Sequence, residues 1–126
     1  MTYASKSDLS IASKKTRGIV VCPRANASLA EGIPNIVQMM EMNCNIAIGT
    51  DNVMINSPDL FREMDFLWKV TMGVHQKRIE PKNILKMVTI NAEKIAIENG
   101  EEFETAYLLP HANRIYLPNS RNSQGN

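Results

Sequence analysis

The residue with the clearest chemical potential is Asp51, which follows the apolar segment 46–49. A carboxylate at the tip of a buried strand is open to substrate or metal, so it can bind a hard or borderline cation or move a proton. Gly49, two residues before it, would let another group approach the backbone closely. Asp51 could instead cap a turn through its own side chain, and spacing alone leaves both interpretations open.

Three further polar residues follow a second apolar segment, 19–22. They are Arg24, Asn26 and Ser28. If the two apolar segments are neighbouring strands, these side chains lie beside Asp51 and are candidates for contact with a substrate. Asn26 could hold its loop or touch the substrate, and Arg24 could pair with a carboxylate. The alternatives are a turn-forming asparagine and a solvated arginine.

The other residues that could take part in binding or catalysis do not form a metal site. The two histidines, His75 and His111, share no HxH or HxxxH spacing, and we interpret both as surface residues. A zinc site usually needs about three or four protein ligands. Asn56, Ser57 and Asp59 read as the start of a helix. The sequence also has no glycine-rich phosphate loop and no GxSxG motif.

The two apolar segments, 19–22 and 46–49, have the pattern of buried parallel strands, because they are apolar throughout and do not alternate. Helices are predicted around these segments. The first begins at a Ser7 cap and stops before Gly18, and the second runs from Pro34 to Asn43. The third begins at a Ser57 cap and stops at Gly73, another begins at Pro81, and the last spans 90–98. Residues 23–28 read as a loop. This order predicts an α/β fold with polar side chains gathered at the carboxyl ends of the strands.

We predict one structural unit over residues 1–100. Beyond it the signal weakens: 107–109 and 114–117 could be short strands, and 118–126 is a polar tail. The whole chain has 126 residues, which is too short for a complete (β/α)8 barrel of roughly 200 residues or more.

The composition and charge of the chain exclude several kinds of partner and location. The formal net charge of +1 argues against nucleic acid or an acidic membrane as a partner. The sequence contains no run of about 18 apolar residues, so it predicts no membrane span, and the first residues show no secretory signal. The two cysteines, Cys22 and Cys44, read as buried free thiols in a reducing compartment. We therefore expect a cytoplasmic protein.

Several motifs together resemble the amidohydrolase superfamily. They are the loop Cys22–Leu29, the glycine-isoleucine start at Gly32–Pro34, and the strand end Gly49–Asn52. The most similar branch is the group of chlorohydrolases and aminohydrolases that includes guanine and cytosine deaminases. The segment Met87–Lys94 is also similar to that group's T-x-N-(G/A)-A-K helix. The resemblance extends over roughly residues 7–100.

The resemblance implies that the chain is the C-terminal portion of a (β/α)8 TIM-type barrel, with 19–22 as the seventh strand and 45–49 as the eighth. Residues 101–126 would be a possible remnant of a small β-sandwich. Asp51 matches the family's aspartate that binds the metal and shuttles protons, and Asn26 matches the asparagine beside the pocket. The implied chemistry is zinc- or iron-dependent hydrolysis of C–N or C–Cl bonds in a nitrogen heterocycle.

The sequence departs from the family pattern in ways that leave two hypotheses. The metal-binding histidines of the early strands have no counterpart here, Ala25 stands where serine or threonine is usual, and Glu93 replaces a small residue. The first hypothesis is part of a hydrolase that needs the rest of the barrel to act. The second is a non-catalytic α/β fragment that associates with itself, because two strands leave open sheet edges.

Overall fold

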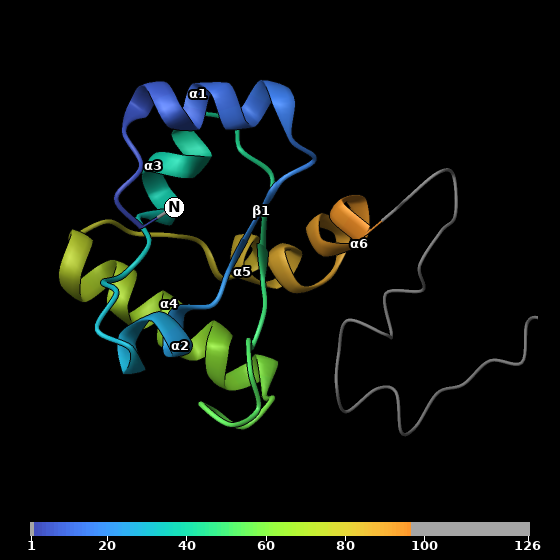
Figure 1. Cartoon of the computed structure of the whole chain (residues 1–126). Helices are drawn as coiled ribbons and strands as arrows, with labels where there is room; N and C mark the ends of the chain where they lie inside the picture. The colour runs from blue at the N-terminus through green and yellow to red at the C-terminus, as the bar shows by residue number, and fades with distance from the viewer. Residues whose placement is uncertain (1, 97–126) are drawn as a thin grey trace, which may run out of the picture.

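The structure is a computed structural model that describes residues 2–96 (Figure 1). In chain order the elements are α1 (Lys6–Lys15), β1 (Ile19–Val21), α2 (Pro23–Ser28), α3 (Ile36–Glu41), β2 (Ile46–Ile48), α4 (Leu60–His75), α5 (Pro81–Val88) and α6 (Ile90–Ala96). The predicted strands 107–109 and 114–117, the polar tail and His111 lie outside the described residues. Within residues 2–96, no helix is long and apolar enough to cross a membrane.

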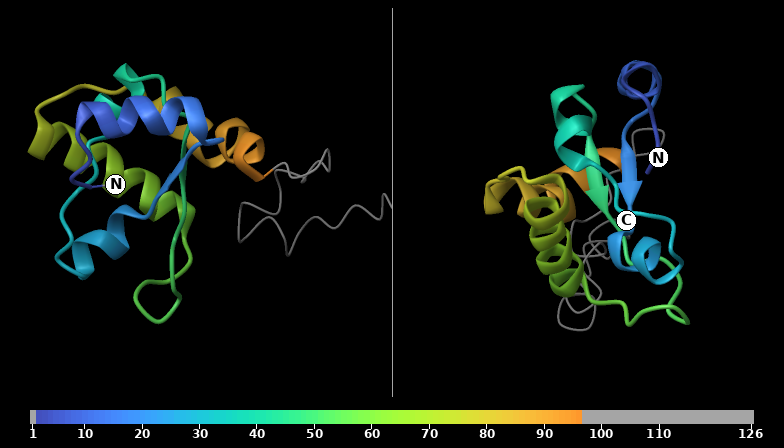
Figure 2. Two further views of the ribbon diagram at one scale, coloured as in Figure 1. Left: turned by 45° about the horizontal axis from the view of Figure 1, so that its top comes forward. Right: turned by 90° about the vertical axis from the view of Figure 1, so that its left-hand side faces the viewer.

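The two strands pair in parallel, with Val20 opposite Ala47 (Figure 2). This confirms the prediction of an α/β fold with parallel strands and surrounding helices. All three residues of β2 are buried, and the strand contacts α3, α4, α5 and α6. In β1, the side chains of Ile19 and Val21 are buried whereas Val20 is 54% exposed. The sheet is therefore covered by helices over β2 and open at Val20.

The amino-terminal end of the sheet is held by two asparagines. Asn91 Nδ2 donates to the carbonyl of Ile46 at 3.0 Å, and Asn45 Nδ2 donates to the carbonyls of Arg17 at 3.1 Å and Asn91 at 3.2 Å. Asn91 belongs to the segment that resembles the T-x-N helix of the amidohydrolases. In this chain it ties α6 to β2, at the end of the sheet opposite Asp51.

Residues 23–28, which we expected to form a loop, form helix α2. Pro23 occupies the first turn, where a missing N–H costs nothing, and the N–H of Leu29 donates to the carbonyl of Ala25. Ala25 is fully buried. The expectation was wrong because a polar helix of six residues has too few turns to show an apolar periodicity. Arg24, Asn26 and Ser28 therefore stand on a helix.

Three helices begin at residues other than those expected. Ser5, and not Ser7, caps α1, because its hydroxyl accepts from the N–H of Asp8 while the Asp8 carboxylate accepts from the N–H of Ser5. Asn35 caps α3, so that the helix starts after Pro34. Asp59 replaces Ser57 as the cap of α4, since its carboxylate accepts from two backbone N–H groups.

Helix α4 does not end at Gly73 but continues to His75. Gln76 then ends it in the left-handed conformation, at φ 52°. A Cβ added at Gly73 would meet nothing within 4 Å, so this glycine neither packs against a neighbour nor terminates the helix. By contrast, Asn43, where we expected the preceding helix to end, follows α3 in the left-handed conformation at φ 56°.

Candidate active site at the carboxyl ends of the strands

Asp51 lies just beyond the carboxyl end of β2 and is exposed. Its backbone is in the left-handed region at φ 59°, which is unfavourable for most residues other than glycine. One carboxylate oxygen, Oδ1, accepts from the N–H of Asn52 at 2.7 Å. Within residues 2–96 no cation forms an ion pair with Asp51. The side chain thus supports its own turn and keeps a second oxygen for another partner.

Gly49 brings the ends of the two strands close together. A Cβ added there would lie 3.1 Å from Val20 Cγ1 and 3.3 Å from Cys22 Sγ. The close approach expected at Gly49 is therefore made by side chains at the end of β1. It places the Cys22 thiol beside the turn that carries Asp51.

The two cysteines are free thiols, as expected. Cys44 is buried and Cys22 is half-buried. Burial raises the pKa of both thiols, and the negative charges of Asp51 and Glu63 raise the pKa of Cys22 further. Because the thiolate is the reactive and metal-binding form, a raised pKa disfavours reaction and metal binding at both side chains.

Asn26 holds a neighbouring segment of chain. Its Nδ2 donates to Thr2 Oγ1 at 3.3 Å, and its side chain is half-buried. Of the two roles considered for this residue, the contact present is the holding one, between α2 and the segment that precedes α1. Ser28 is exposed at the last turn of α2.

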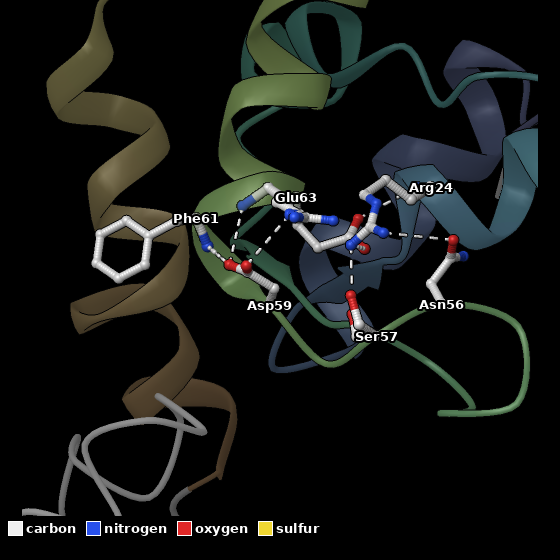
Figure 3. A network of polar contacts seen from close by, with 7 residues as sticks. Arg24, Asn56, Ser57, Asp59, Phe61 and Glu63 are labelled. Carbon is white, nitrogen blue, oxygen red and sulfur yellow. Dashed lines mark hydrogen bonds and ion pairs between the residues drawn. The ribbon is translucent and has the colours of Figure 1, made fainter.

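Arg24 pairs with a carboxylate, but the partner is Glu63 of α4 and not Asp51. Its Nη1 lies 3.5 Å from Glu63 Oε1, and its backbone N–H donates to Glu63 Oε2 at 3.1 Å. The guanidinium also donates to the carbonyl of Ser57 at 3.3 Å and to Asn56 Oδ1 at 3.5 Å (Figure 3). Two residues interpreted as a helix start therefore take part in a polar network with α2.

Glu63 was missed by the sequence analysis. Its side chain has 0% exposure, and burial raises its pKa, with a smaller contribution from the charge of Asp59. The hydrogen bond and the charge of Arg24 act in the opposite direction. Helical periodicity could have found this residue, because it stands three positions after Leu60 and four before Leu67, on the buried face of α4.

The described residues do not fit a complete metal site. No group of three or more His, Cys, Asp or Glu side chains within residues 2–96 could hold an ion. His75 was expected at the surface, which is wrong in part: it is half-buried, and no described group bonds its buried Nε2. Asp51 could contribute one oxygen ligand, and any others would have to come from elsewhere.

Comparison with known proteins gives relatives for most of the chain. A putative aminohydrolase of Methanothermobacter thermautotrophicus is 41% identical over 91 residues, which is 72% of this chain and 24% of the relative. A 5-methylthioadenosine/S-adenosylhomocysteine deaminase of Clostridium tetani is 28% identical over 101 residues, 77% of this chain and 23% of the relative. The chain thus spans about a quarter of the length of these relatives.

A solved structure shares the fold. The zinc-bound adenosine deaminase of Xanthomonas campestris superimposes with a TM-score of 0.70 at 22% identity, over 75% of this chain and 22% of the other. The sequence profile described as "Amidohydrolase family" matches residues 1–96, which includes every described element. With the family's G-T-D strand end in place at the mouth of two parallel strands, the chain belongs to the amidohydrolase family.

Proposed function

We propose that this chain forms the C-terminal part of a (β/α)8 barrel, with β1 and β2 as the seventh and eighth strands. Three observations support this proposal: the parallel pairing of the strands, the helices around β2, and the match to about a quarter of a zinc-bound deaminase. Residues 1–100 would be the barrel part, and residues 101–126, expected as a remnant of a small β-sandwich, lie outside the described residues.

The activity we propose is hydrolysis of a C–N bond in a small nitrogen heterocycle. Two of the relatives described above are named as deaminases, which favours C–N bonds over the C–Cl bonds considered from the sequence. The observation that carries the proposal is Asp51, exposed at the carboxyl ends of the strands with one oxygen left for another partner. In parallel α/β folds, this edge is where catalytic side chains stand.

Asp51 would have two roles in the complete enzyme. It would contribute one oxygen ligand to a zinc or iron ion whose other ligands lie outside residues 2–96 of this chain. It would also take the proton of the attacking water and deliver it to the leaving ammonia, as a carboxylate within hydrogen-bond reach can do. Asn26 and Arg24 would act around it by holding neighbouring segments, and Ser28 stands at the rim.

A second candidate is self-association, with or without catalysis. Within residues 2–96 each strand has only one neighbour, so the outer edges of β1 and β2 are unpaired, and Val20 is 54% exposed beside them. Unpaired edges with exposed apolar side chains favour pairing with another chain. The partner would be the rest of the barrel or a second copy of this chain.

A chimera tests the proposed activity. The matching segment of the Methanothermobacter thermautotrophicus protein would be replaced by this chain, and ammonia release would be measured with methylthioadenosine, adenosine and guanine. We expect release by the chimera and none by this chain alone. Turnover by the isolated chain would refute its incompleteness. A folded, zinc-loaded chimera that releases no ammonia from these heterocycles would refute the proposed activity.

A further inference from the structure

The network around Arg24 joins the segments that follow the two strands. Arg24 stands in the first turn of α2, directly after β1, and Glu63 stands in the first turn of α4, after β2. The segment between β2 and α4 carries Asp51 and, closer to α4, Asn56 and Ser57, which both accept from the Arg24 guanidinium. In Figure 3, Arg24 lies between Glu63 and Asn56 and bonds to both.

The attraction between the two charges does not by itself explain why this ion pair is buried. The side chains of Arg24 and Glu63 are 17% and 0% exposed. Removing two charges from water costs about as much as their attraction returns, and apolar side chains of similar size are often equally stable. What an apolar pair could not supply is the planar fork of the guanidinium, which reaches the carbonyl of Ser57 and the amide of Asn56 together.

The segment held in this way is a compact turn. The carbonyl of Asn52 accepts from the N–H groups of Ile55 at 2.9 Å and Asn56 at 3.4 Å, and Asn52 Oδ1 accepts from the N–H of Met54 at 2.9 Å. Asn56 is the last residue of the turn. A contact that fixes Asn56 therefore fixes the turn as a body, up to Asn52 beside Asp51.

Asp51 lies between this turn and the end of the sheet. On the strand side, the N–H of Gly49 donates to the carbonyl of Val21 at 2.9 Å. At φ 59° the backbone of Asp51 is in the left-handed region, which aspartate tolerates at some cost, and the structure on both sides favours that conformation. The sheet fixes the chain before Asp51, and Arg24 fixes the chain after it.

We propose that Arg24, oriented by Glu63, is a positioning residue that fixes the turn 52–56 and through it the direction of the Asp51 carboxylate. The catalytic meaning of this inference rests on the proposed function of Asp51. The ordering of the turn does not, and it can be measured without any activity.

The test compares two variants of the full chain with the unaltered protein. Arg24→Lys keeps the charge beside Glu63 but lacks the fork, and Arg24→Met combined with Glu63→Met replaces the buried pair by apolar side chains. Amide hydrogen exchange of Ile55 and Asn56 would be followed by NMR, alongside thermal melting. The control is Lys69→Met with Asp65→Met, which removes an ion pair of exposed side chains on α4.

We expect exchange at Ile55 and Asn56 to rise about tenfold or more in both Arg24 variants, because hydrogen bonds from a charged donor are lost. The double apolar variant should lower the melting temperature only modestly, because the N–H of Arg24 loses its acceptor on Glu63, and the control should leave exchange at both amides unchanged. If exchange is unchanged in both Arg24 variants, the pair is only structural and the inference is wrong. Unprotected amides in the unaltered chain would also overturn it.

The two failures are separable in the chimera described above. If Asp51 has no catalytic role, Asp51→Asn leaves ammonia release intact while Arg24→Lys still accelerates exchange in the turn. If Arg24 is not a positioning residue, Arg24→Lys leaves both the exchange and the turnover number unchanged while Asp51→Asn abolishes release.

Discussion

At the scale of single residues, Glu63 is the charged residue that the described part of the chain buries fully. It has no exposed side-chain surface, and burial together with the charge of Asp59 raises its pKa above the ordinary value of 4.5 despite the opposing effect of Arg24. A carboxyl whose pKa is raised on folding contributes stability below its unfolded pKa. That contribution is lost as the pH rises through the folded pKa.

Replacing Glu63 by Gln isolates this effect. Glutamine resembles the protonated acid and does not titrate, so we expect the melting temperature of the unaltered chain minus that of Glu63→Gln to be largest at and below about pH 4 and to shrink as the pH rises through the folded pKa. The shifted carboxyls of Asp8 and Glu80 are present in both proteins and cancel in the difference. A difference that grows with pH would contradict this account.

Residue chemistry was predictable where it depends on local sequence. Asp51 follows an apolar segment and a glycine, which is enough to place it at a strand end. The partner of Arg24 was not predictable, because Glu63 lies 39 positions away and meets it only through the packing of α2 on α4. The metal-ligand role of Asp51 stays a prediction that the geometry allows.

At the scale of elements, both strands and their parallel pairing followed from continuous apolar segments, a pattern typical of strands covered on both faces. The pattern was accurate for β2, whereas Val20 of β1 is 54% exposed. Helix α2 was missed because it is short and polar. The helix starts were displaced because each lies among several capping residues. Which of Ser57 and Asp59 caps α4 depends on the path of the chain, and a local pattern does not fix that path.

Two glycines give a matched test of packing between elements. A Cβ at Gly18 would lie 2.6 Å from the carbonyl oxygen of Asn45 and 2.5 Å from Ile95 Cδ1, so we expect Gly18→Ala to destabilise the chain by about 1–3 kcal/mol.

Gly73→Ala is the control, because it adds the same methyl group to open space inside α4. It should stabilise the chain by about 0.5–1 kcal/mol. Urea unfolding of both variants checks the pair. A Gly18→Ala variant as stable as the unaltered protein would show that Asn45 and Ile95 do not approach the residue before β1 as closely as described.

At the scale of the whole molecule, the chain spans about a quarter of its relatives, and its described residues do not form a metal site. We therefore expect added zinc to raise the melting temperature of the isolated chain little and to bind without fixed stoichiometry. An ion at a hundred times its Kd in a complete site would stabilise the fold by about 2.7 kcal/mol. Stoichiometric zinc with a large thermal shift would contradict this, and light scattering would show whether a dimer builds the site.

The most direct test of the central claim is the effect of Asp51→Asn on ammonia release by the chimera, measured beside Asp65→Asn. Asp65 is a matched control, because it is an aspartate with an exposed side chain, paired with Lys69 on the outer surface of α4. We expect Asp51→Asn to lower the turnover number about a hundredfold or more, since it removes the proton-carrying carboxylate, and Asp65→Asn to leave it unchanged. Equal rates in the two variants would contradict the account.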